Sequence, residues 1–527
     1  MSAISSLVAS PGLAPALDEA SAEALAATLA PAVPGLSIYP ESIAASGGAV
    51  LFMARDSQKK VLAVGWTGAE PPEAARAFEG ESRAIEIAGA RLSLRICPLS
   101  GANAAALRSA LPFSAPRTLG VRPCVGLGDR LGLATPGHVR AVRGTGFSPL
   151  FAQQSIREMT RTNRTPRDVL DASTFGVVEA GWREGFGADG DHLKDPADAA
   201  RCAEAGFTFF TIDPSDHVDS AADKDPPAAL EAKFAKLPWM ELRSSPSACK
   251  AAYSNKDFDL GDSRVWVSAS ALLRAAAKYG RAIAHVLKMR AAISQAAKGR
   301  PFELEMSVDE TPTLTTPAEL LYVASELRRL GVAVASLAPR FIGDFEKGVD
   351  YKGDLAAFDH DFSVHAAIAR FFGPCKIGIH SGSDKFSIYP AAAKHSKRLI
   401  HLKTAGTSWL EALRAIATAA PSLFREIAAY ALGRYEDDRK SYHVTGDVSK
   451  VPALAGLNDA DLPNLLDLHD PRQILHVTYG SILNAKDATG KPLFRDRLMA
   501  ALRAGEATHY AVLEKHLKRH LAPFGTA

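Results

Sequence analysis

Short apolar segments alternate with longer amphipathic segments from about residue 121 onward. Each apolar segment ends in polar residues, and the stretch after it has helical spacing, often beginning with Thr or Asp before Pro or a small residue, which is a helix N-cap signal. Eight segments follow this pattern: PCVGLGDRLG, SPLFAQQS, EGFGADGDH, FTFFTIDPSDH, PFELEMSVDE, VAVASLAPRF, CKIGIHSGSDKF and RLIHLKTAG. Such alternation predicts an α/β fold with a parallel sheet and outer helices. Eight strands predict closure into a (β/α)8 barrel of the TIM type, and an open doubly wound sheet is the alternative.

The segments on either side of this pattern have different periodicities. Residues 1–118 contain five short strand-like runs and two helical stretches, which predict an N-terminal α+β domain ending at the linker FSAPRT. We expect the barrel over residues 119–420, interrupted by a helical insertion at about 219–300. Residues 421–527 are mainly helical and predict an extension packed on the barrel. They contain two distinctive pieces, SYHVTGDVSKVP and QILHVTYGSIL.

Composition narrows the class of protein. The 527 residues are 47% hydrophobic and carry a formal net charge of +3 without a basic block, so neither nucleic acid nor a membrane surface is indicated as a partner. The five cysteines form no C-x-x-C pair, which argues against a disulfide framework and favours a reducing, cytoplasmic location. The N-terminus lacks the features of a signal peptide. We expect a small-molecule substrate and allow for assembly into a homo-oligomer.

Ionisable residues follow most of the predicted strands, where a barrel places its catalytic groups. So many carboxylates and imidazoles at one mouth would repel one another unless a cation held them. A divalent metal resolves this, and Mn, Co, Ni or Zn all suit His and carboxylate ligands. The residues are Asp129, Arg130, Asp189, Asp191, His192, Asp213, Asp216, His217, Glu303, Glu305, Asp309, Glu310, Arg340, His380, Ser381, Asp384, Lys385, His401 and Lys403.

Some of these residues allow two interpretations. Glu303 and Glu305 alternate with apolar residues, which fits either a surface strand or side chains that point into the barrel, and we expect the barrel interior. The aspartates of IDPSDH are either functional or caps of the next helix. The cations Arg340, Lys385 and Lys403 either neutralise nearby carboxylates or hold an anionic substrate. VGLGDRLG lacks the dinucleotide-binding spacing, and neither a phosphate loop nor a nucleophile elbow occurs.

Seven blocks of this sequence resemble the tagaturonate epimerase family: GLGDRLGLATPGHVRA, FGADGDHLKD, FTFFTIDPSDHVD, FELEMSVDET, LAPRFIGDFEKGVDYKGD, KIGIHSGSDKFSIYP and HLKTAGTSWLEALRA. The resemblance as a whole extends over roughly residues 120 to 490. The resemblance implies a divalent-metal enzyme that interconverts tagaturonate and fructuronate, or the matching ketohexoses tagatose and fructose. It implies Asp191 as general base, Glu303 or Glu305 as the second acid, and His192 and His380 as metal ligands. We assign five further residues to substrate binding: Asp129, Arg340, Lys385, His401 and Lys403.

The chemistry of such an epimerisation favours a retro-aldol route. The inverted carbon lies two positions from the ketone, so one enolisation cannot reach it, whereas cleavage, rotation and re-addition can. Two other functions use the same residues. One is a metal-dependent keto-sugar aldolase or isomerase, and the other is a non-catalytic sugar-acid-binding protein.

Overall fold

The eight predicted strands close into a parallel barrel, which confirms the expected fold class and excludes the open sheet. The computed structural model describes residues 13–56, 58–87 and 89–525. Around the barrel the strands pair in the order β10-β13-β14-β15-β16-β7-β8-β9. They are β7 (Cys124–Gly126), β8 (Ser148–Ser155), β9 (Gly187–Leu193), β10 (Phe209–Ile212), β13 (Glu303–Ser307), β14 (Ser336–Ala338), β15 (Lys376–Ile379) and β16 (Ile400–Lys403).

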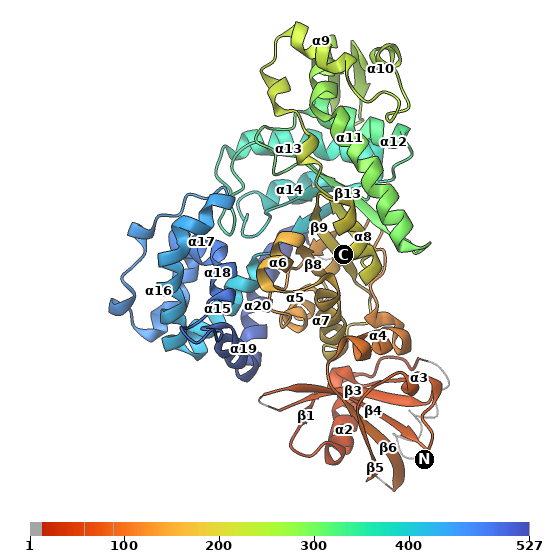
Figure 1. Cartoon of the computed structure of the whole chain (residues 1–527), viewed down its shortest axis with the longest axis vertical. Helices are drawn as coiled ribbons and strands as arrows, with labels where there is room; N and C mark the ends of the chain where they lie inside the picture. The colour runs from red at the N-terminus through yellow and green to blue at the C-terminus, as the bar shows by residue number, and fades with distance from the viewer. Residues whose placement is uncertain (1–12, 57, 88, 526–527) are drawn as a thin grey trace.

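Helices follow every barrel strand and cover its outer face (Figure 1). They are α5 (Thr135–Val142), α6 (Ile156–Thr162), α7 (Pro166–Glu179), α8 (Pro196–Ala205), α11 (Ala269–Ala297), α12 (Pro317–Arg329), α13 (Leu355–Phe372), α14 (Tyr389–Ser396) and α15 (Thr407–Ala419). Their starts have local causes. Thr165 and Thr316 close capping boxes with the acid three residues later, and each precedes a proline at the first helical position.

A separate antiparallel sheet forms the N-terminal part of the described chain, at the bottom of Figure 1. Its strands are β1 (Ser37–Ile38), β2 (Ala44–Ser46), β3 (Ala49–Arg55), β4 (Lys60–Thr67), β5 (Glu81–Ile87) and β6 (Ala90–Cys97), with helices α2 (Glu19–Leu29), α3 (Glu73–Arg76) and α4 (Gly101–Ala110). Phe175 and Val178 of α7 share a hydrophobic cluster with this sheet. The partly buried Lys60 ammonium bonds to Glu179 of α7 at 2.7 Å and to Glu506 at 2.5 Å. The sheet is thereby fastened to the barrel and to the C-terminal helix.

The region expected as a helical insertion has two roles. Helices α9 (Pro227–Ala235) and α10 (Pro246–Tyr253) project from the barrel, together with a two-stranded hairpin of β11 (Lys256–Asp259) and β12 (Arg264–Val267). The helical periodicity of the region did not predict the hairpin. The long helix α11 packs between α8 and α12, so it is the barrel's own helix after β10.

Residues 421–525 are mainly helical and return to the barrel. They contain α16 (Pro421–Asp438), α17 (His469–Val477), α18 (Tyr479–Asn484), α19 (Arg495–Ala504) and α20 (Glu506–Leu521). Helix α20 packs on α5 and α15, and α18 packs on α6. Within the described residues, no helix is both long and apolar enough to cross a membrane. All five cysteines are buried and free.

Candidate active site

An irregularity in β9 turns two neighbouring side chains toward the barrel mouth. Opposite the step from Phe210 to Ile212, β9 has one residue more than β10, which is a β-bulge. His192 has a φ of 48°, a left-handed conformation uncommon for a non-glycine residue. Strict alternation would place Asp191 and His192 on opposite faces of the strand, whereas the bulge lets both line one pocket.

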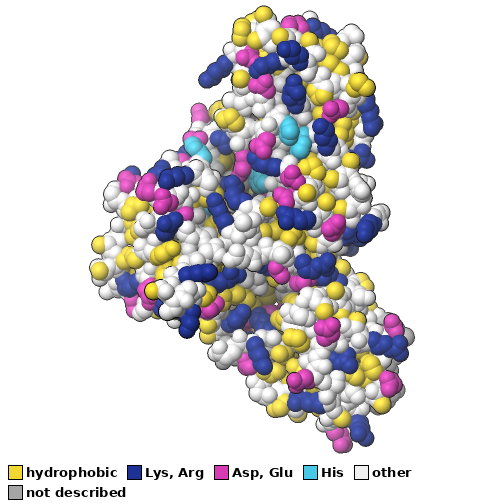
Figure 2. All heavy atoms as spheres, viewed as in Figure 1, with side chains coloured by type: hydrophobic (Ala, Val, Ile, Leu, Met, Phe, Trp, Pro, Cys, Tyr) yellow, Lys and Arg dark blue, Asp and Glu magenta, His cyan; other side chains and the backbone are white. Residues whose placement is uncertain are grey.

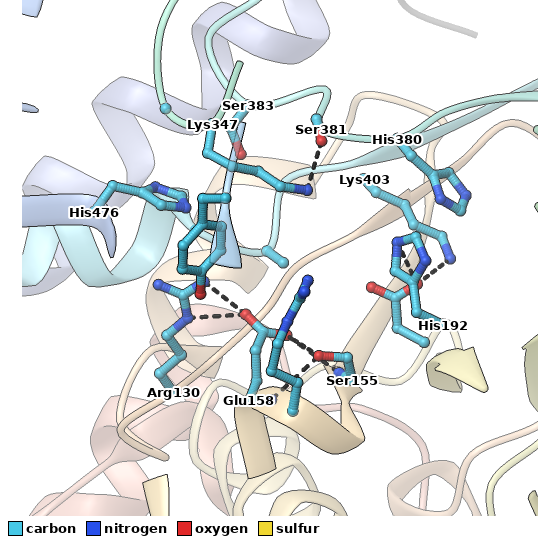
Figure 3. Close-up of a pocket in the computed structure, with 16 residues that line it drawn as sticks. Arg130, Ser155, Glu158, His192, Lys347, His380, Ser381, Ser383, Lys403 and His476 are labelled. Carbon is cyan, nitrogen blue, oxygen red and sulfur yellow. Dashed lines mark hydrogen bonds and ion pairs between the residues drawn. The ribbon is translucent and has the colours of Figure 1, made fainter. Parts of the chain in front are cut away.

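The pocket lies at the carboxyl ends of the barrel strands and encloses about 560 Å³, counting the part open to solvent. Figure 3 shows two groups of side chains on opposite sides of it. On one side lie His192, His380 and Lys403, and on the other lie Arg130 and Lys347. Asp191 and Arg157 also line the pocket. We call Asp191, His192 and His380 the donor cluster, and Arg130, Arg157 and Lys347 the cationic wall. On the molecular surface, histidines mix with acidic and basic side chains near this mouth (Figure 2).

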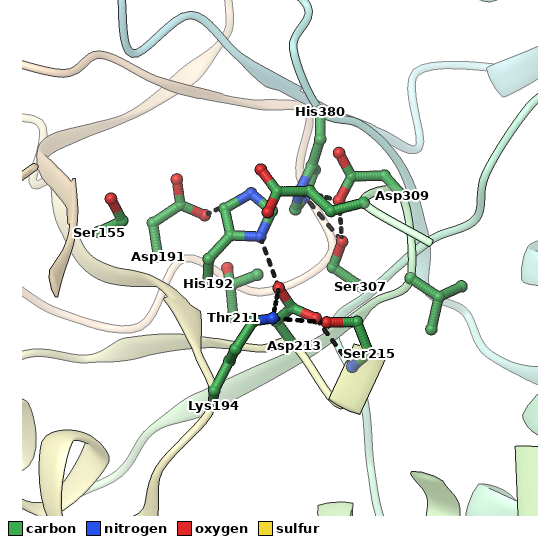
Figure 4. Close-up of polar contacts among 12 residues, drawn as sticks. Ser155, Asp191, His192, Lys194, Thr211, Asp213, Ser215, Ser307, Asp309 and His380 are labelled. Atoms are coloured by element: carbon green, nitrogen blue, oxygen red, sulfur yellow. Dashed lines mark hydrogen bonds and ion pairs between the residues drawn. The ribbon is translucent and has the colours of Figure 1, made fainter. Parts of the chain in front are cut away.

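The donor cluster fits a divalent cation. One potential ligand atom from each of its three residues lies within 4.8 Å of the others. Three protein ligands beside an open pocket are typical of catalytic rather than structural metal sites. Each histidine also has a carboxylate behind it: Asp213 lies 3.3 Å from His192 Nδ1, and Glu305 lies 2.7 Å from His380 Nε2 (Figure 4 shows the first). Such carboxylates fix the orientation of metal-binding imidazoles.

The carboxylates around the donor cluster favour positive charge on or between its two histidines. Burial opposes protonation of His192, but Asp191, Glu310 and Asp309 outweigh it and raise its pKa to about 10. Burial and Lys403 also oppose protonation of His380, but Glu305 and Asp309 outweigh them and raise its pKa. In the bare protein, a proton on His192 helps to balance the surrounding carboxylates. A bound cation would replace it, as metals do when they bind protonated ligands.

Lys403 holds the acidic residues of the barrel interior together. Its ammonium lies 2.7 Å from Asp191 Oδ1, 3.0 Å from Asp189 Oδ2 and 2.9 Å from Glu305 Oε1. Gln153 Nε2 donates to the other Asp191 oxygen at 2.6 Å. Although burial favours a neutral carboxyl, Lys403 and the two histidines depress the pKa of Asp191. Asp191 is therefore ionised and rigidly oriented at the edge of the pocket.

The cationic wall contains unused hydrogen-bond donors. Arg130 forms a buried ion pair with Glu158, at 2.7 and 2.9 Å, yet its Nη1 has no partner within the described residues. The same holds for Arg157 Nε. Lys347 donates to Ser381 Oγ at 2.6 Å. Buried guanidinium N–H donors without a partner indicate an anionic ligand, since carboxylates accept two parallel bonds from arginine.

The C-terminal extension completes this wall. Tyr442 and His476 line the pocket, and they come from the two distinctive pieces of that region, SYHVTGDVSKVP and QILHVTYGSIL. The ring of Tyr442 lies under the guanidinium groups of Arg157 and Arg161, and its hydroxyl accepts a bond from Arg161. A Cβ on Gly406 would lie 1.9 Å from His476, so only glycine permits this approach. Sequence reasoning did not assign Tyr442, His476, Arg157 or Lys347 to the site.

Several predicted site residues lie away from the pocket. Glu303 is at the opposite end of the barrel, where it accepts bonds from the backbone N–H groups of Leu119 and Gly120. Asp129 accepts bonds from four backbone N–H groups of the loop before α5. Arg340 does not line the pocket.

The remaining predicted residues are buried beneath or beside the pocket. The Lys385 ammonium donates to three backbone carbonyls, including that of Glu346 at 2.8 Å, and burial lowers its pKa to about 7. His401 lies in the barrel interior, 2.8 Å from Glu305. Glu305 itself is fully buried, so it can act on a substrate only through His380, His401 or Lys403.

A second group of metal-capable side chains, Asp384, His516 and His520, joins the loop after β15 to α20. Arg472 binds one Asp384 oxygen at 2.7 Å and His516 binds the other at 2.5 Å. The backbone N–H of Asp384 donates to His520 Nε2 at 2.9 Å. Because a permanent cation already neutralises the carboxylate, this group is an ion-pair network that anchors the loop.

A closed barrel with a pocket of ionisable groups at its strand ends defines a (β/α)8-barrel enzyme, and comparison with known proteins places it among the isomerases. The sequence pattern of the tagaturonate epimerase family matches residues 39–524. The chain belongs to that family. A tagaturonate/fructuronate epimerase of Thermotoga maritima is 43% identical over 487 residues, covering 92% of this chain and 96% of that one. The glycerol-bound fructuronate-tagaturonate epimerase of Cohnella laeviribosi is 38% identical, with a TM-score of 0.87 over 97% of this chain and 100% of that one.

Proposed function

We propose that this protein interconverts D-tagaturonate and D-fructuronate with the help of a divalent cation. The observation that carries the proposal is one pocket with the donor cluster on one side and the cationic wall on the other. A keto-sugar acid has matching groups, namely a ketone with neighbouring hydroxyls and a carboxylate. The reactions named for the relatives from Thermotoga maritima and Cohnella laeviribosi support the same substrates.

Asp191, His192 and His380 would hold the cation. When bound, it supplies Lewis acidity that polarises the ketone and acidifies the adjacent hydroxyl. Asp191 accepts the proton from the hydroxyl on the inverted carbon. Lys403, hydrogen-bonded to Asp191, keeps this carboxylate ionised. Asp213 and Glu305 orient the two imidazoles from behind.

Loss of the hydroxyl proton leads to cleavage by retro-aldol chemistry. The bond between the inverted carbon and the carbon next to the ketone breaks, giving an aldehyde and an enediolate. The aldehyde turns, presents its other face and is attacked again, and the proton returns to the new alkoxide. The cationic wall holds the carboxylate-bearing fragment throughout, so that the two pieces stay together.

Product analysis tests this function. The purified protein is incubated with D-fructuronate and Mn²⁺, and the sugars are separated. Tagaturonate is the expected product. Accumulating three-carbon fragments would indicate an aldolase, and unchanged substrate under all divalent metals would indicate a binding protein.

Solvent hydrogen distinguishes the retro-aldol route from direct deprotonation. A retro-aldol route leaves the original hydrogen on the inverted carbon, because only the hydroxyl proton is removed. In heavy water we expect the product to carry no deuterium at that carbon by NMR. Complete deuterium incorporation there would mean that the carbon itself is deprotonated.

Lys347→Met should weaken binding of the sugar acid selectively. A hydrogen bond to a charged group contributes about 1.5–3 kcal/mol, so KM for fructuronate should rise roughly tenfold or more. KM for the neutral ketohexose fructose should change less than twofold. Arg340→Met is the matched control, since Arg340 is a half-buried cation outside the pocket. Equal effects of Lys347→Met on both sugars would contradict a carboxylate contact.

A further inference from the structure

Glu310 connects two cations of the cationic wall. It lies three residues after the end of β13, and its carboxylate is 3.3 Å from Arg157 Nη2 and 3.7 Å from Lys347 Nζ. Arg157 and Lys347 both line the pocket. A carboxylate of the protein therefore already lies where these two cations would grip the carboxylate of a sugar acid.

The ion pairs of Glu310 are longer and more exposed than the Arg130–Glu158 pair of the cationic wall. Arg130 and Glu158 are both buried and bond at 2.7 Å, so the pair is a fixed part of the structure. The Glu310 side chain is 27% exposed and that of Arg157 is 37% exposed, and both distances exceed those of strong charge-assisted bonds. Loose, partly exposed pairs are weak and easily exchanged.

Glu310 also has a second group of partners nearby. One of its oxygens, His192 and Asp213 form a set of potential ligand atoms within 4.8 Å of one another. Moving away from Arg157 and Lys347 would thus not leave the Glu310 carboxylate without a partner, because it is already close to the His192 ring. The same side chain lies between the cationic wall and the donor cluster.

We propose that Glu310 occupies the carboxylate subsite of the pocket until substrate binds, and that the carboxylate of a sugar acid displaces it from Arg157 and Lys347. This rests on the proposed function, and it makes Glu310 a determinant of specificity. The carboxylate of a sugar acid forms new ion pairs with Arg157 and Lys347 in place of those with Glu310. A neutral ketohexose has no carboxylate, so with this sugar the two cations remain paired with Glu310.

Binding of D-gluconate, a sugar acid without a ketone, tests this exchange apart from turnover. Isothermal titration calorimetry is performed on wild-type protein and on Glu310→Gln, both loaded with Mn²⁺. The variant keeps the shape of the side chain but no longer competes for the cations. Gluconate should bind it about five- to tenfold more tightly, the gain expected when two partly exposed ion pairs no longer compete.

Asp216→Asn is the matched control. Asp216 lies at the same mouth and pairs with Lys194 at 3.0 Å, and its loss changes the net charge equally. Its effect on gluconate affinity should stay below twofold, and D-glucitol, the neutral analogue, should bind the Glu310→Gln variant no better than wild type. Four results would overturn the proposal: unchanged affinity, weaker affinity, no detectable binding to the variant, or an equal gain in Asp216→Asn. Failure of the epimerase assay would leave the gluconate result standing, so the two hypotheses fail separately.

Discussion

Removal of divalent cations by dialysis against a chelator is expected to lower turnover of fructuronate by roughly 10³-fold or more, and re-addition of Mn²⁺ should restore it. A Lewis acid contributes several kcal/mol to stabilising developing negative charge, and each 1.36 kcal/mol corresponds to a tenfold change in rate. Initial rates before and after chelation, with metal content measured on the same samples, provide the check. Full turnover in metal-free protein would remove the cation from the proposal.

The same expectation applies to the two histidines of the donor cluster. His192→Ala and His380→Ala should each lose activity in proportion to lost metal, because each removes one of three clustered ligand atoms. His360→Ala, at an exposed position on α13, should retain both metal and rate. A variant of His192 or His380 with normal metal content and normal rate would exclude that residue as a ligand.

Lys403→Met is expected to reduce the free energy of unfolding by about 3–5 kcal/mol, which is the cost of leaving buried charges without their partner. Three carboxylates, those of Asp189, Asp191 and Glu305, lie within 3.0 Å of the ammonium that is lost. Turnover should fall by about 100-fold or more as well, because Asp191 loses the contact that orients it. Denaturant unfolding of chelator-treated protein gives the first quantity, and steady-state kinetics give the second.

Lys376→Met provides a matched control within the barrel. Lys376 is equally buried, but its ammonium donates to the backbone carbonyl of Gly120 at 2.8 Å. Loss of that bond should cost about 1–3 kcal/mol, the price of one unsatisfied buried group. If both substitutions destabilised the protein equally, the carboxylates around Lys403 would not depend on its charge.

The barrel could be predicted because its signal repeats along the chain. Each strand is short and apolar, each helix is amphipathic, and the eight repeats define one topology. Strand-end position also found Asp191, His192, His380 and Lys403, which the structure places around one pocket. The hairpin of β11 and β12 was missed, because its strands are short and largely exposed and carry little hydrophobic pattern.

The alternation of side chains along a strand could not predict how far along the barrel axis each side chain lies. A period of two gives the direction of a side chain but not its distance from the mouth. Glu303 and Glu305 have the same parity, yet one accepts bonds from the backbone at the barrel floor and the other lies beneath the donor cluster. Lys385 follows β15 in sequence, but its burial among backbone carbonyls depends on how the preceding loop folds back.

The side chains on and beside the cationic wall could not be predicted from the sequence for a different reason. Lys347 belongs to a long loop, and Tyr442 and His476 belong to the C-terminal extension, where no strand-end rule applies. The only available signals were two unusual segments, SYHVTGDVSKVP and QILHVTYGSIL. Their roles depend on long-range packing that neither propensity nor periodicity encodes.

The contribution of the C-terminal extension to the pocket has a consequence for the nascent chain on the ribosome. Domains generally fold as they emerge during synthesis. The donor cluster is complete once His380 has left the exit tunnel, whereas His476 emerges almost a hundred residues later. A partly synthesised barrel would thus carry the metal-capable residues with an unfinished mouth. The complete pocket forms only after His476 has been made, so a chain that stops before this residue would lack part of the pocket wall.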